Sequence, residues 1–321
     1  MSLNKIVYIE SDSYNPYVNL SLEEDLLNKA CENILYFYLW QNENTVVIGK
    51  NQSAKQQCNI DLMKKDNVYL ARRSSGGGAV FHDLGNLNYT FIYSKGFFDI
   101  EKNLNVIKKA LSYHGIEAYF SGRNDLLVNG NKISGQAYLN KEKFSLHHGT
   151  LLVNANLKNL SKYLKKDDSK LKTHGVKSHS QRVSNLSSFN NSISVEKIKE
   201  SLEIAISEEF KLPLYKKKEM DNFLFEKYKS NTWLYRLDTK GQRINKRFDY
   251  GLIDMYLKIS NNVITQIDIN SDIMDLNIID EIKRCLINKK LNSKLLCQIK
   301  LSNKVIEKDV INLLEENLCM I

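Results

Sequence analysis

A glycine-rich segment that follows two arginines contains the residue types best suited to anion chemistry. It runs from Arg72 to Asn86 and includes three consecutive glycines, Gly76, Gly77 and Gly78, directly before an apolar pair. Consecutive glycines at the end of a strand let main-chain N–H groups approach an anion closely. The two arginines can add paired donors to a phosphate or a carboxylate. The segment therefore predicts an anion-binding loop, with a flexible surface loop as the alternative.

A second segment, residues 121–136, brings a carboxylate and a lysine to the ends of two expected strands. Asp125 begins one strand, and Lys132 follows Asn129-Gly130, a dipeptide typical of hairpin turns. A lysine held there can act as a point charge against an α-phosphate or a carboxylate. An adjacent carboxylate can hold Mg²⁺ together with substrate phosphates. Taken alone, Lys132 could also be an exposed hairpin lysine.

Two further polar stretches have a less specific pattern. His147 and His148 lie in an expected strand. Because consecutive strand residues point to opposite faces, at most one of them can face a pocket, which argues against a metal pair. A structural histidine and a ligand contact both remain open there. Residues 158–182 are rich in lysine and poor in apolar residues after Leu171. Such a run is usually a solvated surface, and it could instead form a mobile lid over an anionic ligand.

The elements that position these residues mix strands and helices without regular βαβ alternation, which favours an α+β fold over a doubly wound sheet. Near the N-terminus, Ser21 and Glu24 form a capping-box pattern that predicts a helix start at Ser21. The expected strands span residues 36–40, 45–48, 68–71, 89–93, 125–128, 132–138 and 147–153, and the expected helices span residues 102–113 and 195–206.

A second, smaller unit is expected after about residue 240. Apolar residues alternate over 253–259 and again over 263–269, on either side of Asn261-Asn262, which predicts a hairpin. Helical patterns follow over residues 277–288 and 304–318. Two strands and two helices can form a core of their own, so we expect limited contact between this unit and the rest of the chain.

The chain is therefore expected to have two domains, at residues 1–240 and 247–321, with a polar linker within residues 235–247. No G-x-G-x-x-G motif opens an expected helix, and no glycine-rich stretch ends in the Lys-Ser or Lys-Thr of a P-loop. Two common nucleotide-binding motifs are thereby excluded.

Composition indicates an ordinary globular protein with a basic excess. Of 321 residues, 42% are hydrophobic, and the formal net charge of +9 favours acidic partners. No stretch reaches the about 20 apolar residues that a spanning helix needs, and the N-terminal residues lack an apolar signal core. The five cysteines form no C-x-x-C pair, which argues against a structural zinc site and suits a reducing compartment. We therefore expect a cytoplasmic protein that does not enter a membrane.

Together, the polar segments resemble those of the lipoate–protein ligases, within the wider biotin/lipoate ligase family. The similarity covers residues 42–186 and rests on residues 72–86, 122–125, 132–135 and 147–152. A looser similarity, which includes Phe248-Asp-Tyr-Gly-Leu, relates the C-terminal unit to the accessory domain of the long bacterial ligases. The resemblance implies a large mixed-sheet catalytic domain of biotin/lipoate ligase type plus a small α+β C-terminal domain that assists activation.

The resemblance also implies a two-step reaction. ATP, with Mg²⁺, and the lipoate carboxylate first form lipoyl-adenylate and pyrophosphate. The lipoyl group then passes to a specific lysine of a lipoyl domain, in an acyltransferase subunit of a 2-oxoacid dehydrogenase or in the glycine-cleavage H protein. Because two anions must meet in the first step, positive charge and main-chain donors are needed to offset their repulsion. No tightly bound prosthetic group and no nucleic-acid partner are implied.

The resemblance assigns site residues by their match to the family pattern. Lys132 is the implied catalytic residue, in contact with both the lipoate carboxyl and the α-phosphate. ATP or lipoyl-adenylate is expected to contact Arg73, Gly78, Ala79, Val80, Phe81, Asn86, Asp125 and Lys132, and lipoate to contact Ser75, Gly76, Gly77, Lys132 and His148. Asp125 is the one candidate for a Mg²⁺ ligand. Residues 158–182 correspond to the adenylate-binding loop of the family.

Three other functions are alternatives to this interpretation. An ATP-independent octanoyl or lipoyl transferase would need a nucleophilic cysteine, yet no cysteine lies in the strands of Lys132 or His148, and Cys58 is typical of a small buried residue. A biotin ligase is disfavoured by the form of the Arg72–Asp83 segment. A nucleic-acid binder is suggested by an isoelectric point near 9.0, but no corresponding motif accompanies the charge.

Overall fold

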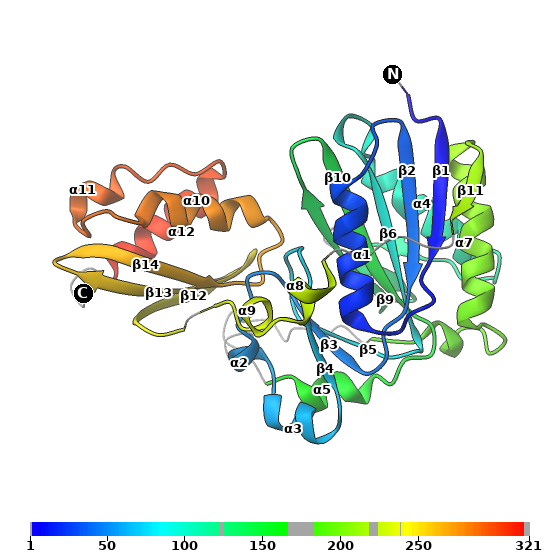
Figure 1. The fold of residues 1–321 in the computed structure, drawn as a ribbon, viewed down its shortest axis with the longest axis horizontal. Coiled ribbons are helices and arrows are strands. Elements are labelled where there is room, and N and C mark those ends of the chain that lie inside the picture. Colours follow the sequence, from blue (N-terminus) through cyan, green and yellow to red (C-terminus); the bar gives the residue numbers. More distant parts are fainter. Residues whose placement is uncertain (1, 122–124, 166–182, 218–223, 238, 318–321) are drawn as a thin grey trace.

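A large N-terminal domain and a small C-terminal domain lie next to each other in the computed structural model (Figure 1). The structure describes residues 2–121, 125–165, 183–217, 224–237 and 239–317. Within these residues no helix is long and apolar enough to cross a lipid bilayer. The basic stretch expected to form a lid falls largely outside the described residues.

The large domain is built on an eight-stranded mixed sheet with the order β11-β1-β2-β6-β10-β9-β8-β7. Strand β1 pairs in parallel with β2 and β11, and the other pairs are antiparallel. The strands are β1 (Lys5–Glu10), β2 (Ile34–Trp40), β6 (Asn86–Ser94), β7 (Tyr119–Phe120), β8 (Asp125–Val128), β9 (Asn131–Asn140), β10 (Phe144–Leu152) and β11 (Leu214–Lys217). Every residue of β6 is buried, as expected of a central strand covered on both faces.

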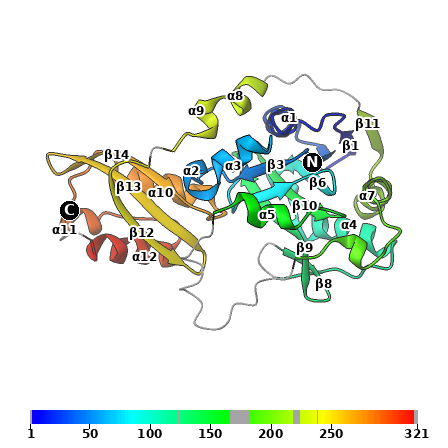
Figure 2. The same ribbon diagram turned by 90° about the horizontal axis from the view of Figure 1, so that it is seen from below.

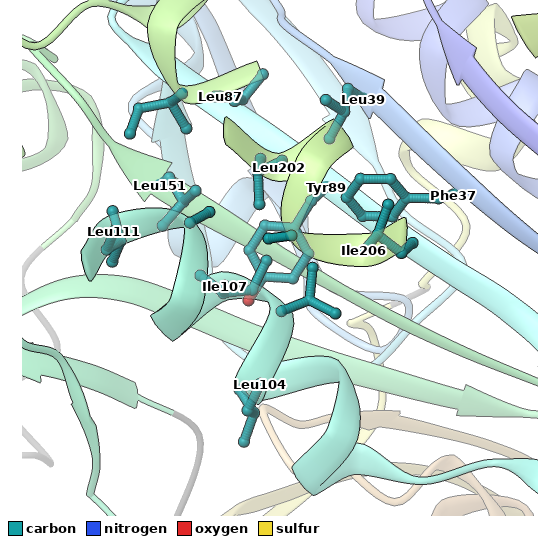
Figure 3. Packing of buried hydrophobic residues seen from close by; sticks show 14 of the residues in the cluster. Phe37, Leu39, Leu87, Tyr89, Leu104, Ile107, Leu111, Leu151, Leu202 and Ile206 are labelled. Atoms are coloured by element: carbon teal, nitrogen blue, oxygen red, sulfur yellow. The ribbon is translucent and has the colours of Figure 1, made fainter. Parts of the chain in front are cut away.

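Helices cover both faces of this sheet. On one face, α4 (Ile100–Ser112) and α7 (Val195–Phe210) pack over the alternate residues Phe37, Leu39, Tyr89 and Phe91 of β2 and β6 (Figure 3). On the other, α1 (Pro16–Asn28) packs over Tyr38, Trp40 and Ile92. This alternation follows from the two-residue period of a strand. Each fully buried Leu or Phe contributes about 1.5–3 kcal/mol, so the two layers hold the sheet firmly.

A smaller three-stranded sheet, of order β4-β3-β5, lies between the large sheet and the C-terminal domain (Figure 2). It contains β3 (Thr45–Ile48), β4 (Tyr69–Arg72) and β5 (Val80–His82), and the glycine-rich loop connects β4 to β5. Short helices border it: α2 (Ala54–Gln57), α3 (Ile60–Lys65), α5 (Lys158–Tyr163), α8 (Phe225–Lys229) and α9 (Asn231–Leu234). Two 3₁₀ turns, η1 (Lys95–Phe97) after β6 and η2 (Leu186–Ser188), belong to the large domain.

In the C-terminal domain, helices pack on a three-stranded antiparallel sheet. Its strands are β12 (Gln242–Phe248), β13 (Gly251–Ser260) and β14 (Val263–Asn270). The helices are α10 (Leu276–Leu286), α11 (Ser293–Leu296) and α12 (Lys304–Glu315). The expected hairpin is confirmed, with Asn261 and Asn262 at φ 49° and 61° in its turn. The buried apolar cluster of this domain contains none of the large domain's residues, so each domain has its own core.

Two expectations about element positions need correction. The domain sheet begins at Gln242, so the boundary placed at residue 247 falls inside β12. The first helix begins at Pro16 rather than at Ser21, because Asn15 accepts the main-chain N–H of Tyr17 and proline suits the first helical position. The hydroxyl of Ser21 instead donates to the carbonyl of Tyr17 within the helix. The remaining expected strands and helices are confirmed with ends shifted by a few residues.

Candidate active site

A cavity of about 910 Å³ opens where the large sheet, the small sheet and the C-terminal domain meet. From the large domain it is lined by Leu20, Trp40, Val47, Arg73, Gly78, Ala79, Val80, His82, Asn88, Lys132, Gly135, Gln136, Ala137, His148, Gly149 and Thr150. From the C-terminal domain it is lined by Arg247, Phe248, Asp249, Tyr250, Gly251, Asp272 and Met274. The lining therefore combines apolar side chains with charged groups from both domains.

The glycine-rich loop is held by close main-chain packing that side chains would prevent. A Cβ atom on Gly49 would lie 2.2 Å from the Gly77 carbonyl oxygen, and Gly77 itself has φ +89°. A Cβ atom on Gly76 would lie 2.6 Å from the carbonyl oxygens of Ile273 and Met274. The triple glycine thus lets the loop pass between the small sheet and the C-terminal domain.

The two arginines before the loop bind main-chain oxygens of the protein itself. Arg72 is fully buried and donates to the carbonyls of Gly49, Lys50, Gln52, Trp233 and Leu234. Burial lowers its pKa to about 9. Its five neutral acceptors together replace the hydration that the guanidinium loses.

Arg73 lines the cavity, but its donors are also directed into the loop. Its Nε donates to Ser75 Oγ and the Gly76 carbonyl, and its Nη2 donates to the carbonyls of Gly76 and Gly78 at 2.6 and 2.7 Å. Burial lowers its pKa to about 10, so the guanidinium stays charged at neutral pH. This geometry favours a role in shaping the loop over the direct nucleotide contact expected from the sequence.

The β8–β9 hairpin places Lys132 beside Asp125, as the Asn-Gly turn predicts. The Lys132 Nζ lies 2.6 Å from Asp125 Oδ1, and the two side chains are 28% and 6% exposed. A Cβ atom on Gly135 would lie 3.3 Å from Lys132 Nζ, so this glycine leaves room for the ammonium group. After the undescribed stretch the chain returns to the same place, where Ser184 N–H donates to the Lys132 carbonyl. Lys132 is therefore an anchored, partly exposed cation at the cavity wall.

A buried hydrogen-bonded chain connects the glycine loop to the sheet. Glu23, on α1, accepts from the Thr90 hydroxyl at 2.6 Å and lies 2.8 Å from His148 Nδ1. The other ring nitrogen of His148, Nε2, lies 2.8 Å from Ser75 Oγ. With the carboxylate ionised, His148 donates from Nδ1 and accepts the Ser75 hydroxyl at Nε2. This chain fixes the position of the loop relative to the cavity floor.

The neighbouring His147 points the other way, as strand alternation predicts. It stacks on Tyr138 at 4.8 Å between ring centroids, and its Nε2 lies 3.0 Å from Gln136 Oε1. Burial lowers its pKa to about 3, so the ring is neutral. His82 also faces the cavity, and burial together with the nearby positive charge of Arg73 lowers its pKa to about 3. Both rings are therefore neutral polar groups and not cationic anchors for an anion.

The structure brings some of the predicted site residues to the cavity and places others behind its wall. Arg73, Gly78, Ala79, Val80, Lys132 and His148 line it, whereas Ser75, Gly76, Gly77, Phe81, Asn86 and Asp125 do not. The Asn86 side chain donates to Asn88, and Asn88 lines the cavity in its place. The Phe81 ring stacks on Tyr163 within the core of the small sheet. Residues 122–124 of the matched pattern lie outside the described residues.

Several cavity residues were missed in the sequence. Trp40 and Val47 form apolar walls and lie in expected strands, and Leu20 lies next to the expected helix start; none of the three was expected at the site. Glu23 had a weak signal, because it is a carboxylate on a helix whose neighbours Leu22 and Leu26 face the core. The wall from the C-terminal domain had none, because this unit was expected only to make limited contact with the rest of the chain and not to share a cavity with it.

The donor set suits a metal ion that arrives with a phosphate substrate rather than a resident one. Within the described residues no group of three or more His, Cys, Asp or Glu side chains could hold a metal ion. Asp125 supplies one nearly buried carboxylate beside the cavity. Mg²⁺ commonly takes one or two carboxylates and completes its shell with waters and substrate phosphates. Asp125 thus fits that use, once its ion pair with Lys132 is loosened by an anionic ligand.

Comparisons with known proteins identify the class to which this fold and cavity belong. The model of the lipoyl protein ligase A/B catalytic domain matches residues 15–207, and that of the bacterial lipoate protein ligase C-terminus matches residues 242–319. The chain therefore belongs to the lipoate–protein ligase family and has both domains of its bacterial members. It is a ligase that forms an amide bond, as the sequence pattern predicts.

Individual relatives agree with this assignment. Lipoate-protein ligase A of Psychrobacter cryohalolentis is 38% identical over 301 residues, which cover 89% of each chain. The structure of P. falciparum LipL1 in complex with lipoate is 31% identical and covers 96% of this chain and 98% of its own, with a TM-score of 0.83. A bipartite lipoate protein ligase from Thermoplasma acidophilum, described with its E2 lipoyl domain, is 26% identical, covers 75% of this chain and 99% of its own, and has a TM-score of 0.64.

Proposed function

We propose that the chain joins lipoate to ATP as lipoyl-adenylate and then transfers the lipoyl group to a lysine of a lipoyl domain. The observation that carries this proposal is the position of Lys132 at the wall of a cavity that also has an apolar part. A carboxylate is a poor acyl donor, so amide formation requires that it first be joined to a good leaving group. Adenylation with loss of pyrophosphate does this, and Lys132 is placed to offset the charge of the two anions that meet.

Lipoate fits the cavity by chemistry as well as by family. The dithiolane ring and its alkyl chain are apolar, and Leu20, Trp40, Val47, Val80 and Ala137 supply matching walls. The carboxylate end would then point toward Lys132. The P. falciparum relative, which covers nearly the whole chain, is solved in complex with lipoate. The neutral ring of His82, whose pKa is lowered by burial, suits a site that must not hold the lipoate carboxylate among its apolar walls.

In the activation step, one carboxylate oxygen attacks the α-phosphorus of ATP and the bond to the bridging oxygen breaks. Lys132 binds the attacking carboxylate and the α-phosphate, and so brings them together. Main-chain N–H groups of Gly78, Ala79 and Val80 are the proposed donors to the nucleotide. Mg²⁺ bound with the phosphates would reduce their charge, and Asp125 is the side chain that would hold it.

Transfer uses the same cavity with a different second substrate. The acceptor amine attacks the lipoyl carbonyl and AMP leaves, so the site must admit a lysine side chain from outside. A lipoyl domain is the proposed acceptor, since the T. acidophilum relative is described with its E2 lipoyl domain. The net charge of +9 favours an acidic acceptor surface. An acyltransferase subunit of a 2-oxoacid dehydrogenase and the glycine-cleavage H protein are the two acceptors to compare, and a cytoplasmic location is part of the proposal.

The test of adenylation measures pyrophosphate. Purified protein with MgATP should release pyrophosphate only when lipoate is added, and addition of apo lipoyl domain should increase the rate by removing the adenylate. Release that does not depend on lipoate, or no release in the presence of acceptor, would count against the proposal.

A cysteine variant separates this mechanism from that of a thioester-forming transferase. Cys58 is 1% exposed, and burial raises the pKa of its thiol to about 12, which makes it a poor nucleophile. None of the described cysteines lines the cavity. We expect Cys58→Ala to retain ATP-dependent lipoylation within about twofold and to lose about 1 kcal/mol of stability from the small void. Measurements of rate and of urea unfolding check this. Loss of transfer in a folded variant would support a thioester route.

A further inference from the structure

Among the described residues, the C-terminal domain contributes one cationic side chain to the cavity, Arg247, near the end of β12. Its side chain is 12% exposed, and both terminal nitrogens lie 3.1 Å from Asp272 Oδ2. The other oxygen of Asp272 accepts the main-chain N–H of Leu252 at 2.8 Å. The carboxylate is therefore fixed by the β13 backbone and in turn orients the guanidinium.

The hairpin that carries Arg247 is rigidly held. Its tip is Asp249-Tyr250, and the rings of Phe248 and Tyr250 stack at 5.2 Å with an interplanar angle of 5°. The Tyr250 hydroxyl donates to Asp309 of α12 at 3.1 Å. Gly251 has φ +145°, and a Cβ atom there would lie 3.0 Å from Asp272 Oδ1. A side chain on such a support loses little conformational entropy when it binds a ligand.

The same region of the C-terminal domain contacts the glycine-rich loop. The segment that follows β14 contains Asp272 and continues through Ile273 and Met274, which pack against Gly76 and Gly77. Residues Ser271 and Asn51 are joined by a main-chain hydrogen bond of 2.8 Å. Arg247 is thus placed at the cavity by contacts between the two domains, not by an accidental approach of a surface side chain.

Of the cations that line the cavity, none has yet been assigned to the β- and γ-phosphates of ATP. Its described lining contains three cations of the Lys and Arg type: Arg73, Lys132 and Arg247. The nitrogens of Arg73 donate to Ser75 and to main-chain carbonyls of the loop and of Val47. Lys132 serves the carboxylate and the α-phosphate in the proposed function. Neither Arg73 nor Lys132 is therefore available to bind the β- and γ-phosphates, which carry most of the charge of ATP.

We propose that Arg247 binds the β- and γ-phosphates of ATP during activation and that Asp272 positions it. As the bond between the α-phosphorus and the bridging oxygen breaks, the electron pair remains on that oxygen and negative charge grows on the departing pyrophosphate. A planar guanidinium can donate two hydrogen bonds to such a group. Asp249 and Asp272 share the wall, and the Arg247–Asp272 pair has no net charge as a whole, so the phosphates must share the guanidinium donors with Asp272. Transfer, by contrast, involves no pyrophosphate and has no need of Arg247.

This inference rests on the proposed function, and the test keeps the two apart. The full-length protein is compared with Arg247→Ala, Arg247→Lys and the matched control Lys246→Ala. Lys246 is the next residue on β12, its side chain is 45% exposed, and it pairs with Glu316 outside the cavity. Three rates are measured: lipoate-dependent exchange of labelled pyrophosphate into ATP, ATP formation from synthetic lipoyl-adenylate and pyrophosphate, and lipoyl transfer from that adenylate to an apo lipoyl domain.

In Arg247→Ala, exchange should fall on the order of 100-fold, and the KM for pyrophosphate in the reverse reaction should rise. Transfer should stay within about twofold of the wild type, Arg247→Lys should be intermediate, and Lys246→Ala should match the wild type in all three rates. Asp272→Asn should lower exchange less than Arg247→Ala does. In the double variant, exchange should be no lower than in Arg247→Ala alone, because a residue that only positions Arg247 has no effect once Arg247 is absent. If Arg247→Ala folds poorly, the Asp272→Asn variant still tests the role of Arg247 through its own fall in exchange.

Two outcomes would overturn the assignment of Arg247. One is exchange within twofold of the wild type in a folded Arg247→Ala protein. The other is an equal fall in exchange and in transfer, which would indicate a general structural role. If the wild-type protein neither exchanges pyrophosphate nor uses lipoyl-adenylate, the proposed function itself fails, and this result is distinct from both.

Discussion

Replacement of Lys132 by Met should lower lipoate-dependent pyrophosphate release by a factor of about 10²–10³, the usual cost of one electrostatic donor in an active site. Lys132 is the cation placed where the carboxylate and the α-phosphate meet, with its Nζ 2.6 Å from Asp125. Without it the two anions repel each other, and the other two cations of the described lining, Arg73 and Arg247, are already paired with the glycine-rich loop and with Asp272. The measurement is the initial rate of pyrophosphate release with saturating lipoate and MgATP.

The Lys132 variant has a stability problem that the experiment must address. Asp125 is 6% exposed, so removal of Lys132 leaves a nearly buried carboxylate without its ion-pair partner, which is costly. The double variant Lys132→Met/Asp125→Asn removes this charge and should recover the melting temperature but not the activity. Lys143→Ala, at an exposed position between β9 and β10, is the matched control and should behave as wild type. Adenylation near the wild-type rate in a folded Lys132→Met protein would exclude the assigned role.

Removal of the C-terminal domain after residue 241 should abolish adenylation and largely spare transfer. The domain supplies a wall of the cavity and covers Gly76 and Gly77, so its loss opens the site to water and weakens every charge interaction there. We expect a fall of more than 100-fold in pyrophosphate release, since the wall and the Arg247 contact are lost together. Transfer from synthetic lipoyl-adenylate should retain at least about a fifth of the wild-type rate, because the apolar walls and Lys132 remain.

The truncated protein should fold, because the buried clusters of the large domain contain no residue beyond 241. Its circular dichroism spectrum and cooperative thermal unfolding are the controls. If a folded truncation transfers no lipoyl group, the C-terminal domain is needed for acceptor docking. If it adenylates at the full rate, the wall that the domain forms has no part in activation.

The parts of the fold that local patterns encode were predictable. Alternation placed the strands of the C-terminal hairpin, and Asn129-Gly130 placed the turn that brings Asp125 and Lys132 together. The opposite orientation of His147 and His148 follows from the period of a strand alone. These features depend on neighbours within a few residues, so a single sequence contains the information.

The parts that depend on distant partners were not predictable. Glu23 contacts His148, which lies 125 positions later in the sequence, and the residues around neither of them indicate this contact. Arg73 matched a nucleotide-binding pattern, yet the loop that it precedes folds back and supplies the acceptors for its guanidinium. The wall of the cavity around Arg247 depends on how two separately folded domains pack, which hydrophobic periodicity does not report.

The reaction proposed for this protein joins lipoate to a lysine of a lipoyl domain and consumes ATP. Mass spectrometry of an apo lipoyl domain after incubation with the protein, lipoate and MgATP tests it most directly. We expect a mass increase of one lipoyl group that disappears when ATP or lipoate is omitted or when the target lysine is replaced. An unmodified domain in the complete mixture, or the same modification without ATP, would contradict it.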